Sequence, residues 1–302
     1  MPLRAPFLHT KTKNRRFFTF AMRDGARMED NCYFCVMKTD ISGMTALVTG
    51  GSSGIGLEYA RQLAALGCRL VLVSNRGDEL AEAASNLKAT AVTTVFMDLA
   101  QEGCAGRLLE TCDNLGLTID ILVNNAGMFF MKYLDDEVLP RARAMMELHV
   151  KTVTELCILF GNRMKSRGRG YILNMSSMAA RIPAPGIAIY SASKAYLKIF
   201  GKGFSSEMRP FGVYVTTVCP AAIDTGLYNI SDRLRRIGRR IGLIRSKESL
   251  VRRALRALFR GRRTVSPGLT NVLLPPVIAI LPSRLVDRLG MKWIYKPGAS
   301  AD

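Results

Sequence analysis

Long apolar runs are missing from this 302-residue sequence. No run approaches the roughly 20 residues that a helix needs to span a bilayer. The basic N-terminal part lacks the apolar core of an export signal, so we expect an intracellular, cytoplasmic protein whose only membrane contact would be peripheral, at the inner surface. Hydrophobic residues still make up 48% of the chain, which is enough for a substantial core and excludes wholesale disorder.

Metal-binding side chains are scarce. Histidine occurs only twice, as His9 and His149, and the pair Cys32–Cys35 has no second pair to complete a zinc site. We therefore predict no metal.

The seven cysteines form an odd, scattered set, which argues against a disulfide framework and for a reducing compartment. They are Cys32, Cys35, Cys68, Cys104, Cys112, Cys157 and Cys219.

Acidic residues are few, and the excess of Lys and Arg over Asp and Glu is concentrated in two regions of the chain. The net charge is +19. Residues 233–263 hold thirteen Lys and Arg against one acid, and residues 1–40 hold eight against four. No basic segment is interleaved with aromatic side chains in the pattern of a known nucleic-acid-binding module. We therefore do not expect the protein to bind nucleic acid.

Strand and helix patterns alternate from residue 44 onward. Short apolar runs predict strands at 44–49, 69–74, 91–96, 119–124, 170–174 and 213–219. Helical patterns lie between them. The first spans 54–66, and the second follows the strand 69–74 and ends at about residue 88. The others span about 100–115, 138–167 and 189–208. This alternation predicts a Rossmann-like α/β fold with a doubly wound parallel sheet, whose ligand binds outside the carboxyl ends of the strands.

The stretch Thr45–Gly56 joins a strand to a helix through a glycine-rich turn. Such a turn directs free backbone N–H groups, and the positive end of the helix dipole, at a phosphate. Gly50, Gly54 and Gly56 depart from the spacing of the common dinucleotide fingerprint. They can nevertheless serve the same three purposes, which are the tight turn, the close backbone approach and the helix packing.

Tyr190 and Lys194 lie four residues apart at the start of a predicted helix, so they share one face. Ser177 precedes Tyr190 by thirteen residues and follows a predicted strand. On their own, a tyrosine and a lysine at this spacing would indicate only a solvated helix face. The other motifs at matching distances argue for a site instead.

Four motifs together resemble the short-chain dehydrogenase/reductase family, in order and spacing, over about residues 44–225. They are the Thr49–Gly56 turn, Asn124–Gly127, Ser177 and the Tyr190–Lys194 pair. The resemblance implies an oxidoreductase that acts on CH–OH groups with a nicotinamide cofactor. It also implies that Tyr190 is the general acid/base, that Lys194 binds the ribose and lowers the tyrosine pKa, and that Ser177 holds the substrate oxygen.

The resemblance further implies a set of cofactor contacts. Asn124–Gly127 would close the wall beside the cofactor, Asp98 would meet the adenine and Thr225 the carboxamide. One departure is Ala221, which stands where the family usually has glycine. The full set is Gly50, Ser52, Ser53, Gly54, Ile55, Gly56, Asn75, Arg76, Asp98, Leu99, Asn125, Ala126, Gly127, Tyr190, Lys194, Pro220, Ile223 and Thr225.

A second departure lies on the long helix, where the family commonly carries a catalytic asparagine and this sequence has His149. The family's proton relay uses the main-chain carbonyl of that residue, reached from the lysine through a water, so a histidine could serve. We name His149 as a candidate catalytic residue. Helix packing and direct acid/base chemistry are the alternatives, and packing is the preferred one of the two.

Cofactor choice is decided after the second strand. An acid there would bind the ribose 2′-hydroxyl and repel a 2′-phosphate. Here the strand ends in Ser74, Asn75 and Arg76, with no acid before Asp78. We therefore favour NADP(H) over NAD(H), although the family's usual arginine is displaced by one position, with Asn75 in its place.

The loops expected on the substrate side are apolar, which favours a sizeable hydrophobic carbonyl or alcohol substrate. Two enzymes fit, a hydroxysteroid dehydrogenase-like carbonyl reductase and a 3-oxoacyl or 3-ketosphinganine-type reductase of lipid metabolism. A cofactor-binding scaffold or sensor with little turnover is a third hypothesis. We expect a homodimer or homotetramer, so the same side chains could also serve packing or subunit contact. They are Met128, Phe129, Phe130, Met131, Met178 and Ile182.

Three parts are expected along the chain: a flexible extension (1–42), the NADP-binding and catalytic domain (43–225), and a basic helical substrate lid with an apolar tail (226–302). Residues 233–244 and a second helix capped by Ser246 are basic and amphipathic, and Val272–Leu281 is apolar but broken by prolines. These helices could lie on an anionic membrane, or could form a solvated face over the cleft.

Overall fold

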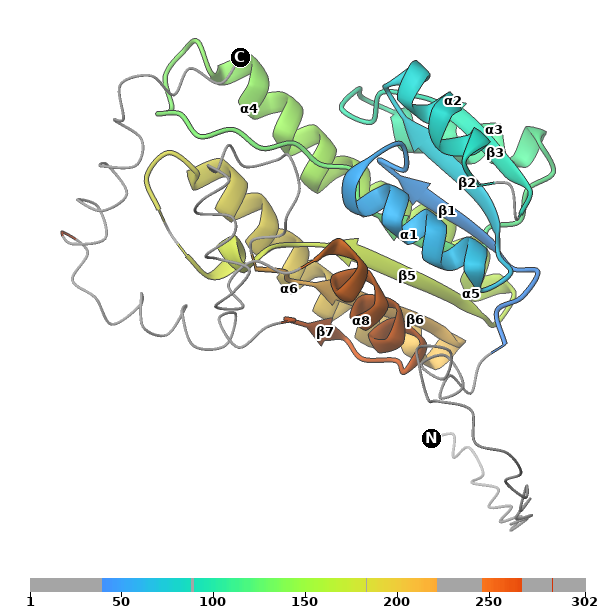
Figure 1. The fold of residues 1–302 in the computed structure, drawn as a ribbon. Coiled ribbons are helices and arrows are strands. Elements are labelled where there is room, and N and C mark those ends of the chain that lie inside the picture. Colours follow the sequence, from blue (N-terminus) through green and yellow to red (C-terminus); the bar gives the residue numbers. More distant parts are fainter. Residues whose placement is uncertain (1–39, 88–89, 183, 222–245, 268–283, 285–302) are drawn as a thin grey trace, which may run out of the picture. The chain divides into compact units, whose positions relative to one another are not determined.

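The computed structural model describes residues 40–87, 90–182, 184–221, 246–267 and 284, all within the compact unit Thr39–Asp302 (Figure 1). The extension expected at 1–42 falls almost entirely outside these residues, as do the helix expected at 233–244 and the apolar run 272–281. Among the described residues, no helix combines the length and apolarity that crossing a membrane would need.

Seven parallel strands form one sheet in the order β3-β2-β1-β4-β5-β6-β7. The order reverses between β1 and β4, and the crevice that opens at such a switch point is where α/β folds bind ligands. The predicted Rossmann-like doubly wound sheet is confirmed. Its strands are β1 Thr45–Thr49, β2 Arg69–Ser74, β3 Val92–Phe96, β4 Ile121–Asn124, β5 Gly170–Met175, β6 Val213–Val218 and β7 Thr264–Val265.

Helices cover both faces of this sheet (Figure 1). Helices α1 and α8 pack together on one face, α3 and α5 pack together on the other, and α6 packs on β6. The central strands are continuous apolar runs because both of their faces are covered. The helices are α1 Gly54–Ala65, α2 Gly77–Ser85, α3 Cys104–Asn114, α4 Leu139–Met146, α5 Val153–Ser166, α6 Ala188–Met208 and α8 Lys247–Phe259.

The long helix predicted over 138–167 is not regular, and the prediction needs correction. Helix α4 ends at Met146, a π-helical turn occupies Glu147–Thr152, and α5 begins at Val153. A π turn accommodates an extra residue and changes which way its side chains face. His149 lies inside this turn, where its side chain is fully buried.

Helix α8 belongs to the α/β fold rather than to a lid. The expected cap is present, since Ser246 Oγ accepts a hydrogen bond from the Ser249 amide at 3.3 Å. The apolar side of α8, including Leu250 and Leu255, is buried against α1, β5 and β6, and β7 extends the sheet beside β6. The boundary that we expected at residue 225 therefore cuts through the domain.

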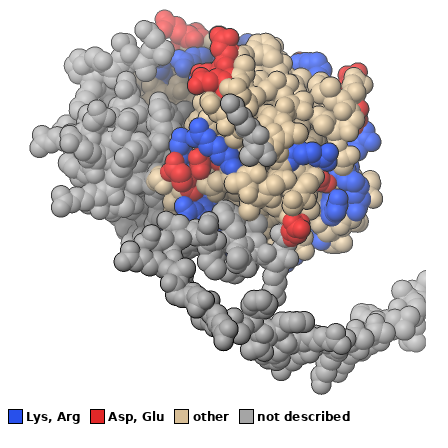
Figure 2. Space-filling model, turned by 45° about the vertical axis from the view of Figure 1, so that its right-hand side comes forward, with Lys and Arg blue, Asp and Glu red and all other residues tan. Residues whose placement is uncertain are grey.

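This placement also limits the membrane hypothesis. The apolar face of α8 is covered by the protein itself, so this helix could meet a membrane only with polar and basic residues such as Arg253 and Arg260, which are exposed. On the face drawn in Figure 2, the basic side chains of the described residues stand in separate groups, some beside acidic ones.

Leu255→Ala should lower the free energy of unfolding by about 2–5 kcal/mol, because it leaves a cavity between α8 and the sheet. Arg253→Ala, on the exposed side of the same helix, should change it by less than about 0.5 kcal/mol. Urea unfolding followed by circular dichroism measures both. Equally small effects would contradict the placement of α8 in the core.

Candidate active site

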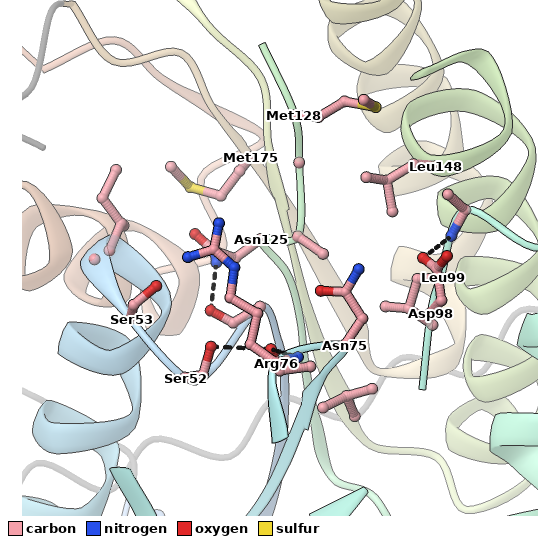
Figure 3. A pocket seen from close by; sticks show the side chains of 18 of the residues that line it. Ser52, Ser53, Asn75, Arg76, Asp98, Leu99, Asn125, Met128, Leu148 and Met175 are labelled. Atoms are coloured by element: carbon pink, nitrogen blue, oxygen red, sulfur yellow. Dashed lines mark hydrogen bonds between the residues drawn. The ribbon is translucent and has the colours of Figure 1, made fainter. Parts of the chain in front are cut away.

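A cavity of about 850 Å³ opens at the carboxyl ends of the strands, where the switch point lies. Figure 3 looks into it, with Ser52 and Ser53 from the turn before α1, Asn75 and Arg76 from the turn after β2, and Met128 across the pocket. Its size is typical of a small-molecule site.

The structure brings most of the predicted site residues to this one cavity. Gly56 and His149 do not line it, and Ile223 and Thr225 lie outside the described residues. The predicted residues that do line it are Gly50, Ser52, Ser53, Gly54, Ile55, Asn75, Arg76, Asp98, Leu99, Asn125, Ala126, Gly127, Ser177, Tyr190, Lys194 and Pro220.

The glycine turn depends on close backbone approach. Gly50 and Gly54 have φ of 63° and 58°, in the left-handed region that side chains disfavour. A Cβ on Gly56 would collide with the Gly50 carbonyl oxygen. Gly56 therefore contributes to the site without lining it, because it allows the first turn of α1 to pack against the turn that follows β1.

A clamp that sequence reasoning missed joins the turns after β1 and β4. The Thr49 hydroxyl accepts hydrogen bonds from the amides of Asn125 and Ala126, at 2.9 and 3.0 Å. The Asn125 side chain also donates, from Nδ2 to the Thr49 carbonyl at 3.0 Å. These bonds hold two cavity walls in a fixed register, and the threonine just before the glycines was the signal for them.

Arg76 lies at the cavity with 65% of its side chain exposed, and it forms an ion pair with Glu79 at 2.9 Å. Glu79 also lies 3.4 Å from Ser52 Oγ, which in turn lies 2.9 Å from Ser74 Oγ. The carboxylate that influences Arg76 is therefore Glu79 rather than Asp78. An i, i+3 spacing on the start of α2 was its only signal in the sequence.

Tyr190 and Lys194 lie on one face of α6, and both are buried. Lys194 Nζ donates to the Met175 carbonyl at 3.1 Å and lies 5.6 Å from the centre of the Tyr190 ring. Burial lowers the pKa of Lys194 to about 8, because the low-dielectric interior disfavours its charge. The lysine is thus held beside the tyrosine as a poorly solvated cation.

Ser177 follows β5 and begins a short 3₁₀ turn, Met178–Arg181. Its Oγ accepts a hydrogen bond from the Ala179 amide at 3.1 Å. That bond uses an oxygen lone pair and leaves the hydroxyl proton available to a ligand in the cavity. Ser177 can therefore donate to a ligand while it accepts from Ala179.

The apolar residues expected on the substrate side divide into two groups. Phe130 is buried with Val138 and Met145, so it serves packing. Phe129 packs edge-on against Tyr190, with ring centres 4.9 Å apart, and Met128 lines the cavity. Met131 is 44% exposed. Of the six apolar residues predicted on the substrate side, only Met128 lines the cavity.

His149 is fully buried, and both of its ring nitrogens have partners. Nε2 accepts a hydrogen bond from the Met128 amide, and Nδ1 lies beside Ser193 Oγ, each at 3.0 Å. Burial, together with the Lys194 cation, holds the pKa of His149 well below 6.5. The ring is therefore neutral at physiological pH, and direct acid/base chemistry on a substrate does not fit this geometry.

Comparison with known proteins gives concordant matches. The sequence matches the family model for short chain dehydrogenase over residues 44–233. The 17-beta-hydroxysteroid dehydrogenase type 3 of Danio rerio is 29% identical over 251 residues, which cover 80% of this chain and 78% of that protein. The human very-long-chain 3-oxoacyl-CoA reductase is 31% identical over 263 residues, which cover 84% and 77%.

Solved structures agree with these sequence matches. A short-chain dehydrogenase from Sphingobium yanoikuyae, in complex with NADPH, has a TM-score of 0.68 and 28% sequence identity. The match covers 86% of this chain and 99% of that one. The family match from residue 44 to residue 233 includes every residue that lines the cavity.

The buried lysine should make stability depend on pH. Unfolded lysine keeps its proton up to about pH 10.5, whereas folded Lys194 releases it near pH 8, so the unfolded state binds more protons between these values. The contribution of Lys194 to the free energy of unfolding should therefore rise by up to about 1.4 kcal/mol per pH unit above pH 8. Burial raises the pKa of five cysteines, which acts in the opposite direction near pH 9 but is common to the wild type and to Lys194→Met. Urea titrations of both proteins at pH 7.5 and 9.5 isolate the lysine: the difference in stability between wild type and Lys194→Met should shift in favour of the wild type as the pH rises. An identical pH dependence in both proteins would contradict the assignment.

Proposed function

The chain belongs to the short chain dehydrogenase family, and on this premise we propose that it interconverts a ketone and a secondary alcohol on a hydrophobic substrate, using a nicotinamide cofactor. The observation that carries the proposal is the cavity itself. Ser177, Tyr190 and Lys194 share it with the glycine turn before α1. The reacting group and the cofactor would therefore meet in one place.

The residues present fit a dinucleotide cofactor. The turn at Gly50 and Gly54 and the start of α1 offer backbone N–H groups and a helix dipole to a pyrophosphate. Asn125–Gly127 would form the wall beside the nicotinamide, and Lys194 would hold the ribose hydroxyls. When bound, the cofactor supplies or accepts the hydride.

Tyr190 is the proposed proton donor in reduction and proton acceptor in oxidation. Lowering a phenol pKa from about 10 to near 7 requires roughly 4 kcal/mol of preference for the phenolate. A cation about 5 Å away in an effective dielectric near 20 contributes about 3 kcal/mol. Lys194, whose Nζ lies 5.6 Å from the ring centre, supplies most of that preference.

Ser177 would hold the substrate oxygen. Its oxygen accepts from the Ala179 amide, so its hydroxyl proton remains free to bind the reacting carbonyl. A donor fixed in this way favours the charge that develops on the carbonyl oxygen during reduction. Tyr190 then gives the proton to the same oxygen, and the product is the alcohol.

NADP(H) is the proposed cofactor. No acid stands at the end of β2, and Arg76 lies at the cavity. Its ion pair with Glu79 is exposed, and such pairs contribute little, so the guanidinium can turn to a 2′-phosphate. The NADPH bound to the Sphingobium yanoikuyae enzyme supports this choice.

The proposed substrate is a steroid or a long-chain 3-oxo lipid. The two relatives are named for a hydroxysteroid and for a very-long-chain 3-oxoacyl-CoA. In this chain, Met128 and Leu148 line the cavity and Phe129 packs beside Tyr190, which supports an apolar substrate of either kind. Turnover of a panel of sterols, 3-oxo lipids and small ketones with NADPH would identify the class.

Tyr190→Phe should lower kcat at least 10²–10⁴-fold on a substrate found in that panel, because it removes the proton donor. NADPH binding, measured by fluorescence titration, should change little because the ring remains. Near-native kcat in this variant would overturn the role of Tyr190. The matched control is Tyr196→Phe, on the exposed side of the same helix, which should have the kcat of the wild-type protein.

Arg76→Ala should weaken NADPH binding about 10–100-fold, the range expected for one charge-assisted contact of 1.5–3 kcal/mol. NADH binding should change less than about threefold, because NADH has no 2′-phosphate. Glu79→Gln removes the competing carboxylate and should tighten NADPH alone. Equal losses for both cofactors in Arg76→Ala would remove Arg76 from the 2′-phosphate site.

A further inference from the structure

His149 occupies the junction between the cavity wall and helix α6. Its side chain is fully buried in the π-helical turn Glu147–Thr152. The ring bonds on one side to the main chain of Met128, which lines the cavity, and on the other to Ser193, which precedes Lys194 on α6. One imidazole therefore connects the two elements that shape the reaction centre.

The partners of the ring determine its tautomer. An amide N–H can only donate, so Nε2 accepts from Met128 and carries no proton. The single N–H of a neutral imidazole is then on Nδ1, which donates to Ser193 Oγ. The Ser193 hydroxyl donates in turn to the Tyr190 carbonyl at 2.8 Å. Three directed bonds thus lead from the cavity wall to the tyrosine.

The ring lies close to the cavity wall and to Tyr190. A Cβ on Gly127 would lie 3.1 Å from His149 Nε2 and 3.7 Å from Lys194 Nζ. The centres of the His149 and Tyr190 rings are 6.0 Å apart. A change in the orientation of the imidazole would therefore displace the wall, the lysine or the tyrosine.

We propose that His149 is a positioning residue, whose neutral imidazole fixes the distance between the cavity wall at Met128 and the turn of α6 that carries Tyr190 and Lys194. The inference rests on the proposed function for its effect on turnover. In the proton relay implied by the family resemblance, this position acts through its main-chain carbonyl. The role proposed here belongs to the side chain, which holds the wall and α6 together. The ring itself exchanges no proton with the substrate.

The charge state of the ring is part of this role. Protonation would place an N–H against the Met128 amide N–H and a second cation near Lys194. Tyr190 and Lys194 on α6 lie near the ring, and its own turn also carries Glu147 and Lys151. Burial and Lys194 both lower the pKa of His149, so the bonding chain stays intact at neutral pH.

Four substitutions separate the two halves of the chain of bonds. In His149→Asn the amide nitrogen takes the place of Nδ1 and can still donate to Ser193. In His149→Gln the amide oxygen takes the place of Nε2 and can still accept from Met128. His149→Phe keeps the ring volume and loses both bonds. Ser193→Ala breaks the α6 side alone.

For His149→Phe we expect kcat per cofactor-binding site to fall 10–100-fold, with KM for the ketone and Kd for NADPH changing less than threefold, because misplaced reacting groups slow the reaction more than they weaken binding. His149→Asn and His149→Gln should each recover part of the loss, and Ser193→Ala should add little to His149→Phe. If all three His149 variants lose the same activity, or if their kcat values stay native, hydrogen-bonded positioning is overturned.

The tautomer can be tested without any turnover. With ¹⁵N-labelled histidine the chain gives only two imidazole spectra, and His9→Gln leaves that of His149 alone. We expect a neutral Nδ1–H ring at neutral pH and no titration near pH 6.5, because burial and Lys194 both lower the pKa of His149. An Nε2–H tautomer, or titration near pH 6.5, would overturn this inference and leave the proposed function untouched, since Tyr190→Phe tests that function separately.

Discussion

The site depends on how closely main chain can approach main chain at the switch point of the sheet. Helix α1 can start where it does only because Gly56 has no side chain to meet the Gly50 carbonyl. The Thr49 hydroxyl and the Asn125 amide then tie the turn after β1 to the turn after β4. Without this contact the glycine N–H groups and the wall at Asn125–Gly127 would not face a common space.

One buried charge organises the protonation states on the other side of the cavity. Lys194 is a cation in a poorly solvated place, and its own pKa is lowered to about 8. In the proposed reaction the same charge would favour a phenolate at Tyr190. At His149, burial is the main force that opposes an imidazolium, and the Lys194 charge adds to it. One lysine therefore acts on two neighbouring groups in opposite senses.

Local spacing predicted the parts of the fold and site that depend on nearby residues. The alternating strands and helices, the glycine turn and the shared face of Tyr190 and Lys194 could all be read from residues a few positions apart. The π turn at Glu147–Thr152 could not, because a π bulge leaves the helical pattern of the sequence nearly unchanged. The Met128 and Ser193 bonds of His149 link segments 21 and 44 residues away, which no local pattern reports.

Helix α8 was misplaced for a related reason, since an apolar stripe fits a membrane and a sheet equally well. The oligomeric state and the cellular location stay predictions.

The packing of α8 on α1 has a consequence for how the chain folds. Gln62 on α1 donates to the main-chain carbonyl of Glu248, 186 residues further along. β7, which lies next to β6, comes later still. Contacts between such distant segments raise the contact order and slow folding. During synthesis the faces of β5 and β6 on which α8 packs lack this helix from the completion of β6 at Val218 until Lys247–Phe259 have left the ribosome. A chaperone that binds this surface early would protect the half of the fold that already holds the glycine turn.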